Sequence, residues 1–241
     1  MSASKSARRV SWCVAIAAVA CTSETVKPAA GANAAPPAQD ASVPSDKASF
    51  FVSSDTSTAA NLGGLSGADA RCARLAAAAK LPKQTWRAYL SVEHGDGGPI
   101  DARDRIGAGP WYNVRGVKLA DDLASLHART GDADVFLDEH GDKIPGQWAG
   151  SPAPVQHDVL TGSASDGTVL AGKTCEDWTS ESATEAAQVG HTDGLGPNMS
   201  SSAPYSSWNS AHANGGCNDT APLGGAGRIY CFAVVPYSAS Q

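Results

Sequence analysis

The chain lacks long apolar runs, closely spaced cysteines and paired histidines. Beyond residue 21, no apolar run approaches the roughly 20 residues that a membrane-spanning helix needs, so no membrane span is expected there. None of the six cysteines forms a C-x-x-C pair, which disfavours a four-cysteine zinc site. The six histidines form neither H-E-x-x-H nor H-x-H, the spacings of common catalytic zinc sites.

Positive charge is also scarce. The chain has 18 Lys and Arg against 24 Asp and Glu, a formal net charge of −6. Three of the basic residues lie within 1–20, so a chain without that segment carries 15 against 24, a net charge of −9. So acidic a surface argues against nucleic acid, anionic lipid and sulfated polysaccharide as partners held by bulk charge.

The first 21 residues have the composition of an export signal. A short apolar segment at 10–20 follows three basic residues, Lys5, Arg8 and Arg9. It ends in Ala-Val-Ala-Cys, which resembles the bacterial lipobox, although Ala18 stands where leucine is usual. The alternative is an ordinary signal peptide cleaved after Ala20, which leaves an odd free thiol at Cys21. We expect residues 1–20 to be a lipoprotein signal peptide and Cys21 to carry the lipid, anchoring the protein to the bacterial envelope, at the outer membrane or cell surface.

Residues 21–46 are expected to be a disordered tether. They are rich in Ala, Pro, Ser and Thr and contain no aromatic residue. Such a segment cannot bury enough apolar surface to offset the entropy lost on ordering. The folded part is therefore expected at 47–238, as a single domain.

This domain is predicted to be α+β. Its apolar and alternating runs predict strands at 48–53, 86–92, 155–160, 169–178 and 228–234. Turn-forming residues at 139–142 predict a hairpin, and 119–127 a short helix. Weak helical periodicity with many short strands fits a twisted, mainly antiparallel sheet with one or two helices and long loops. The polar segment at 180–214 is long enough to be a functional loop.

A longer helix is predicted from Ser66 to the residues before Pro82. One of its faces is apolar: Ala68, Cys72, Leu75, Ala76 and Ala79. The Ser66 hydroxyl is expected to cap the first turn, with Asp69 favoured there by the helix dipole. Ser66 also lies in a sequence close to the G-x-S-x-G nucleophile elbow, without its final glycine. A hydrolase using Ser66 is thus the alternative to a structural cap.

Three motifs occur in a fixed order: G-x-x-G-A-D-x-x-C at 64–72, W-R-A-Y-L-S at 86–91 and C-E-x-W at 175–178. With the closing strand they resemble the endostatin-like branch of the C-type-lectin-like fold. That branch includes the C-terminal domain of collagen XVIII and the endostatin-like surface lipoproteins of leptospires. The resemblance covers residues 47–238.

The resemblance implies two nested disulfides. Four cysteines allow three pairings, and the sequence alone does not choose among them. The family pattern joins Cys72 to Cys231 and Cys175 to Cys217. The zinc site of collagen-type endostatins is not carried over, because no histidine precedes His94. Their heparin-binding arginine cluster is missing as well.

No metal or cofactor is expected. The two close pairs of histidine and acid, His157 with Asp158 and His191 with Asp193, are expected to be solvated loop residues. Calcium-dependent lectins use W-N-D with E-P-N or Q-P-D, whereas this chain has Trp208-Asn209-Ser210 and neither tripeptide. A calcium site would have to draw on the following side chains: Glu176, Asn209, Asn218 and Asp219.

The resemblance places ligand binding in the loops between 180 and 218. The expected binding surface comprises Asn198, Tyr205, Trp208, Asn209 and Asn214, with aromatic rings as anchors and amides as adaptable polar contacts. Trp86, Trp148 and Trp178 are expected in the core. For Trp111 and Trp208 an exposed ring and a ring folded back on the core remain open alternatives.

These observations predict a monomeric, non-catalytic cell-surface binding domain. The resemblance to leptospiral proteins implies a protein or glycan ligand, such as extracellular matrix. A structural envelope protein without a discrete ligand is the alternative from another class, beside the Ser66 hydrolase. A shared fold does not by itself fix the function.

Overall fold

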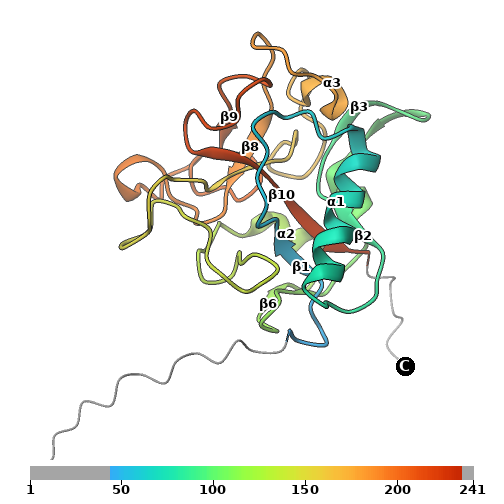
Figure 1. Ribbon diagram of the computed structural model, residues 1–241, viewed down its shortest axis with the longest axis vertical. Helices are drawn as coiled ribbons and strands as arrows, with labels where there is room; N and C mark the ends of the chain where they lie inside the picture. The colour runs from blue at the N-terminus through green and yellow to red at the C-terminus, as the bar shows by residue number, and fades with distance from the viewer. Residues whose placement is uncertain (1–43, 235–241) are drawn as a thin grey trace, which may run out of the picture. The chain divides into compact units, whose positions relative to one another are not determined.

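The computed structural model describes residues 44–234 (Figure 1). The expected signal peptide at 1–20, the lipidation site Cys21 and the tether up to residue 43 lie outside this range. The domain is α+β, with few helices, mainly antiparallel strand pairs and two disulfides. Within residues 44–234 no helix combines the length and apolar character that crossing a membrane requires.

Strand β10 (Gly225–Ala233) is the centre of the main sheet, and all nine of its residues are buried. Its C-terminal half pairs antiparallel with β1 (Phe50–Val52) and with β2 (Trp86–Ala88). Its N-terminal half pairs parallel with β7 (Asp158–Leu160). The sheet continues antiparallel through β8 (Gln188–His191) to β9 (His212–Ala213).

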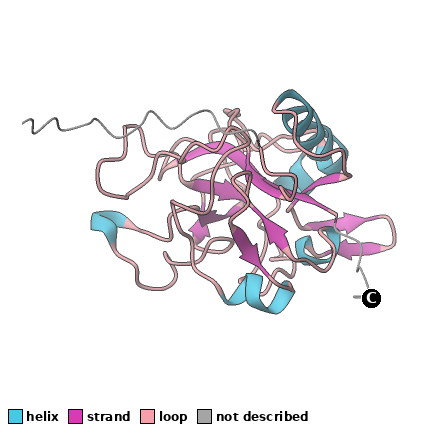
Figure 2. Cartoon of the chain, turned by 90° about the horizontal axis from the view of Figure 1, so that it is seen from below, coloured by secondary structure: helices cyan, strands magenta, loops and turns pink. Residues whose placement is uncertain are grey.

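Smaller elements surround this sheet (Figure 2). Two short hairpins join β3 (Val92–Gly95) to β4 (Gly98–Ile100) and β5 (Trp111–Tyr112) to β6 (Lys118–Ala120). The helical elements are α1 (Gly64–Ala78), η1 (Ala102–Arg105), α2 (Leu123–Ala128), α3 (Cys175–Trp178) and η2 (Pro197–Met199). The helix expected at 119–127 is thus a strand followed by a short helix, and the strand expected at 86–92 ends at Ala88.

Alternation along β10 separates two apolar cores. Ile229 and Cys231 pack with α1, on the side that also holds Trp86 and Trp178. Tyr230 and Phe232 face the other side, in a cluster with several aromatic rings: Phe50, Tyr89, Trp111, Phe136 and Trp208. The strand pattern of the closing segment therefore builds both cores, because successive side chains point to opposite faces.

The two disulfides have the pairing that the resemblance implies. Cys72 on α1 joins Cys231 on β10, and Cys175 on α3 joins Cys217. The first bond closes a sequence separation of 159 residues, and the second one of 42. In the chain-entropy treatment the longer loop corresponds to about 5 kcal/mol of stabilisation.

The strand expected at 169–178 is wrong: residues 169–174 make only isolated bridges, through Val169 and Thr174, and 175–178 form α3. All four residues of α3 have positive φ, between 48° and 70°, so the chain makes a left-handed turn there. Buried contacts hold the turn: the Trp178 indole donates to the Ser91 carbonyl at 2.8 Å, and Cys175 is disulfide-bonded. The Asp177 carboxylate accepts from the backbone amides of Glu93 and His94. Tertiary contacts thus override the strand pattern of the sequence.

The capping role expected for Ser66 is also wrong. Helix α1 begins at Gly64, after Gly63 in a left-handed conformation, and no side chain caps it. Ser66 lies inside the first turn and is exposed. Asp69 lies beyond the first turn and accepts from the Ala88 backbone amide and from Arg105, at 2.8–2.9 Å. A glycine that tolerates positive φ allows the helix to start two residues earlier than expected.

Candidate functional site: a loop beside a buried histidine and aspartate cluster

Five ionisable side chains from three neighbouring strands meet at the β7–β8–β9 side of the sheet. Asp158 begins β7 and is the register partner of His191, which ends β8. His157 directly precedes β7, Asp193 follows β8 by two residues, and His212 lies on β9. Antiparallel pairing therefore gathers residues that lie up to 55 positions apart in the sequence. We call these five residues the histidine–aspartate cluster.

The expectation that these side chains are solvated is wrong. His157, Asp158 and His191 are 3%, 2% and 1% exposed, and Asp193 is 6% exposed. His212 is the most accessible of the five, with 25% of its side chain exposed. The reason is their position on or beside paired strands, where one side of each strand faces the interior. Burial of this many ionisable groups needs a compensating partner for each charge.

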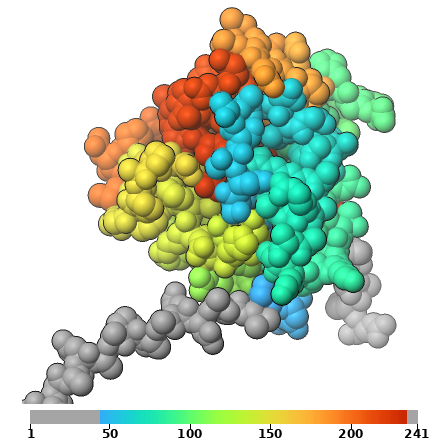
Figure 3. All heavy atoms as spheres, viewed as in Figure 1, coloured from blue at the N-terminus to red at the C-terminus, as the bar shows by residue number. Residues whose placement is uncertain are grey.

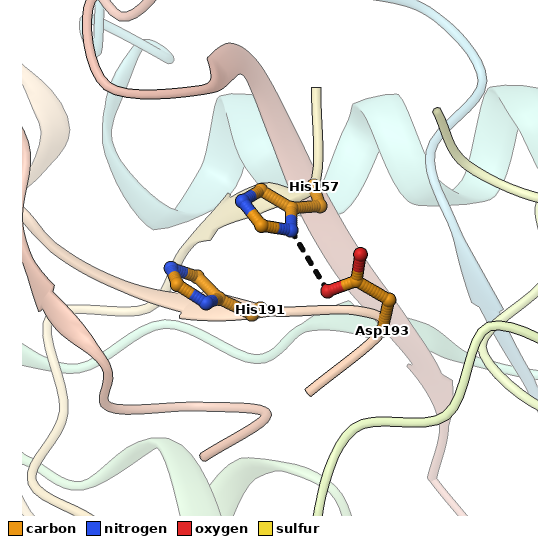
Figure 4. Close-up of side chains that lie close together, drawn as sticks. All are labelled: His157, His191 and Asp193. Carbon is orange, nitrogen blue, oxygen red and sulfur yellow. Dashed lines mark hydrogen bonds and ion pairs between the residues drawn. The ribbon is translucent and has the colours of Figure 1, made fainter. Parts of the chain in front are cut away.

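Asp193 has such partners (Figure 4). Its Oδ1 accepts from His157 Nδ1 at 2.8 Å, and its oxygens also accept from the backbone amides of Gln147 and Leu195. Burial raises the pKa of Asp193, but the hydrogen bond and charge of His157 and the two amides outweigh it, so that the pKa lies below its usual value. Asp193 is therefore a carboxylate, and His157 carries its hydrogen on Nδ1.

Asp158 lacks partners of this kind. Neither of its buried carboxylate oxygens has a hydrogen-bond partner among the described residues. Three imidazole Nε2 atoms surround the carboxylate instead: His191 at 3.2 Å and His157 at 3.4 Å from Oδ1, and His212 at 3.6 Å from Oδ2. A buried acid is thus enclosed by nitrogens that contact it without hydrogen-bond geometry.

His191 connects the cluster to the surface. Its ring stacks on His157, with centroids 4.2 Å apart and planes 15° apart. On Tyr205 the ring centroids are 6.0 Å apart and the planes 11° apart. Neither ring nitrogen of His191 has a hydrogen-bond partner within the described part of the chain. His191 therefore contributes ring contacts and two free nitrogens, but no hydrogen bond.

Donor atoms of the kind that bind divalent metals come close together here. One set is His157, His191 and Asp193, and the other is Asp158, His191 and His212; within each set the donor atoms lie within 4.8 Å of one another. The sequence alone did not predict any metal site. The available signal was the His157-Asp158 dipeptide inside an expected strand, because one of two adjacent strand residues usually faces the interior.

Only some residues of the expected binding surface are exposed. Asn198 is exposed and Tyr205 half-buried, in the segment 194–206. Trp208 is fully buried, with its indole donating to the Leu126 carbonyl at 2.9 Å, so it belongs to the core and the exposed alternative is wrong. Trp111, the other ring left open, is also fully buried.

Two of the expected polar contacts are engaged inside the protein. The Asn209 amide donates to Tyr89 Oη at 3.1 Å and to the Ala164 carbonyl at 3.0 Å. Asn214 accepts from the Ala187 amide and donates to the Gly216 carbonyl. Because both side chains are buried and hydrogen-bonded, neither is available to a ligand. Asn209 is for the same reason no calcium ligand.

The other residues considered as calcium ligands are Glu176, Asn218 and Asp219. Glu176 is exposed and lines a surface hollow of about 360 Å³ with Glu93, Asp177 and Glu185. A hydrogen bond with Glu185 and the like charge of that residue raise the pKa of Glu176. Asp219 accepts from the Ala221 backbone amide, and Asn218 is exposed.

No protein-family model matches the chain, and no curated protein matches it.

Proposed function

We propose that this chain is an exported bacterial lipoprotein whose single, monomeric domain binds a ligand at the cell surface without catalysis. The supporting features of the sequence are the export signal ending at Cys21 and the ordered endostatin-like motifs. The α+β architecture and the two disulfides are compatible with an endostatin-like, C-type-lectin-like domain. The ligand is a protein or glycan, such as a component of extracellular matrix.

The observation that carries the proposal is the exposed segment 197–204, which we call the outer loop (Figure 3). Its two ends contact each other, and the C-terminal end is held by the body of the domain. On one side Gly196 lies against the Tyr205 ring, so closely that a Cβ there would be 2.4 Å from the ring. On the other side the Ser206 carbonyl accepts from the Gly131 amide, and Ser207 forms an isolated antiparallel β-bridge with Thr130. A loop fixed at its ends with an exposed tip is a suitable binding surface.

The chemistry of the outer loop favours a neutral ligand surface. Residues 194–206 contain no charged side chain in a chain with a net charge of −6. Met199 is 55% exposed, one of the few large apolar side chains so exposed in the described range, and Asn198 and several serines flank it. An accessible flexible apolar group among hydrogen-bonding side chains can contact protein or sugar surfaces.

An array of extracellular-matrix proteins and glycans tests this proposal. The full chain should bind at least one member, and the double variant Asn198→Ala, Met199→Ala should weaken that binding by about 2 kcal/mol, the size of a binding hot spot. Leu223→Ala is a matched control, because Leu223 is also exposed, apolar and at positive φ. An equal loss in the control, or no loss in the double variant, would place the binding surface elsewhere. A chain that binds nothing on the array would favour the structural envelope protein.

A further inference from the structure

No hydrogen bond from the described residues satisfies the Asp158 carboxylate. Two of the three histidines around it have their Nδ1 hydrogen engaged: His157 donates to Asp193, and His212 donates to the Ala213 carbonyl at 3.0 Å. A neutral imidazole has one N–H, so the Nε2 of each carries a lone pair beside the carboxylate. These contacts bring acceptor atoms together, and no described group donates to Asp158.

The separations match those between ligands of one metal ion. Ligand atoms at about 2.0–2.1 Å from a tetrahedral zinc ion lie about 3.3 Å from one another. The distances from an Asp158 oxygen to the Nε2 atoms of His191 and His212 are 3.2 and 3.6 Å, and one donor atom from each of the three residues lies within 4.8 Å of the others. Metal ligands aim their lone pairs at a common centre, and this explains why such close contacts lack hydrogen-bond geometry.

We propose that Asp158, His191 and His212 bind a zinc ion, with a water molecule completing the coordination. This set is favoured over the one containing Asp193, because Asp193 already accepts from His157 and two backbone amides. Asp193 instead holds His157, whose ring stacks on that of the proposed ligand His191. Imidazole with one carboxylate suits zinc, whereas calcium and magnesium prefer oxygen ligands. His212 is the most exposed of the ligands and marks the entry side.

The ion would lie beside the support of the outer loop. His191, a proposed ligand, stacks on both His157 and Tyr205. Tyr205 in turn packs against Gly196, where the loop begins. Zinc would therefore fix the imidazole on which the loop is built. The proposal does not depend on the loop having a ligand, and its test uses zinc alone.

Calorimetric titration of the full chain tests the site directly. The chain is prepared without a polyhistidine tag, with Cys13→Ser and Cys21→Ser to remove free thiols, and is dialysed against a chelator. Zinc should bind with a stoichiometry of one. Cobalt should bind in its place with the visible absorption of a tetrahedral ion and without thiolate charge-transfer bands. A chain that binds neither ion would overturn the proposal.

Zinc affinities of single variants test which residues bind the ion. His191→Ala and Asp158→Asn should each weaken zinc binding by at least about 100-fold, the upper end of the range for outer-shell groups. Asp193→Asn should weaken it less than either, because Asp193 contacts the ligand His191 only through the His157 ring. His94→Ala is the matched control, because His94 pairs with Asp177 on the surface and is 84% exposed. It should leave the affinity unchanged. If His94→Ala abolishes binding, or if Asp158→Asn and His191→Ala bind as the parent does, zinc binds elsewhere.

A misfolded variant would not obscure the result. His212→Ala changes the least buried ligand and should keep the circular dichroism spectrum of the parent while weakening zinc binding. In the parent chain, zinc should shift the NMR signals of the cluster imidazoles and leave those of His94 and His140 in place. Shifts confined to His94 or His140 would contradict the site.

Discussion

Asp69 and Asp158 lie beside strands of the same sheet and differ in what surrounds them. Asp69 accepts from Arg105 through both oxygens, from Arg87 and from the Ala88 amide, so that it joins α1 to β2. Asp158 is more deeply buried and has no hydrogen-bond donor among the described residues. Arg87 and Arg105 supply the opposite charge for Asp69, so the fold explains the role of Asp69. Asp158 has three imidazoles around it and no hydrogen-bond donor among the described residues, and for that reason we propose a metal ion there.

The largest expected effect concerns the first acid. Asp69→Ala should lower the free energy of unfolding by about 3–5 kcal/mol, because it leaves Arg105, with only 6% of its side chain exposed, as an unpaired buried charge. Urea denaturation measures the change. Asp96→Ala, at an exposed acid, should change the same quantity by less than about 0.5 kcal/mol. A small effect at Asp69 would remove the contrast on which the comparison is based.

In a chelator the second acid should behave in the opposite way. Asp158→Asn removes a buried carboxylate to which no described group donates a hydrogen bond, so the free energy of unfolding should stay the same or rise. An amide can also donate to the neighbouring Nε2 atoms, which the carboxylate cannot.

Zinc should also stabilise the Asp69→Ala and Asp158→Asn variants to different extents. At a free concentration 100 times the dissociation constant, zinc should stabilise the parent chain by about 2.7 kcal/mol, because it binds the folded state. The Asp69→Ala variant, if it is folded, should gain the same increment, whereas Asp158→Asn should gain almost none. Thermal unfolding with and without zinc measures both. An equal gain in the Asp158→Asn variant would show that Asp158 is not a ligand.

Much of the fold was predictable because its signals are local. The apolar face through Cys72 and Leu75 predicted α1, and the run at Phe50 predicted β1. The exact start of α1 was not, since it depends on Gly63 adopting a left-handed conformation. The left-handed turn at 175–178 is held by Ser91 and Cys217, residues far away in the sequence. No local pattern contains that information.

The site was less predictable than the fold. His157, His191 and His212 lie on or next to three strands, and only the sheet register brings them together. Around His191 and His212 the sequence suggested a loop, because short strands with glycine and polar neighbours carry little periodicity. Trp208 was misplaced for the related reason that a polar segment around it concealed its burial. Asn198 and Tyr205 are the parts of the expected surface that remain accessible.

The smallest expected effect tests whether the outer loop is built on the cluster. The rings of Tyr205 and His191 have centroids 6.0 Å apart, within the range of stacked aromatic pairs. A double-mutant cycle of Tyr205→Ala and His191→Ala should give a coupling energy of about 0.5–1.5 kcal/mol in urea denaturation, measured in a chelator so that zinc does not contribute. The control cycle pairs Tyr205→Ala with His94→Ala and should give a coupling near zero, because His94 is exposed and contacts Asp177 instead. In zinc the first cycle should give a larger coupling, since a bound ion fixes the imidazole on which Tyr205 stacks. Equal coupling energies in the two cycles would show that the Tyr205 and His191 rings do not stabilise each other. The outer loop would then be independent of the histidine–aspartate cluster.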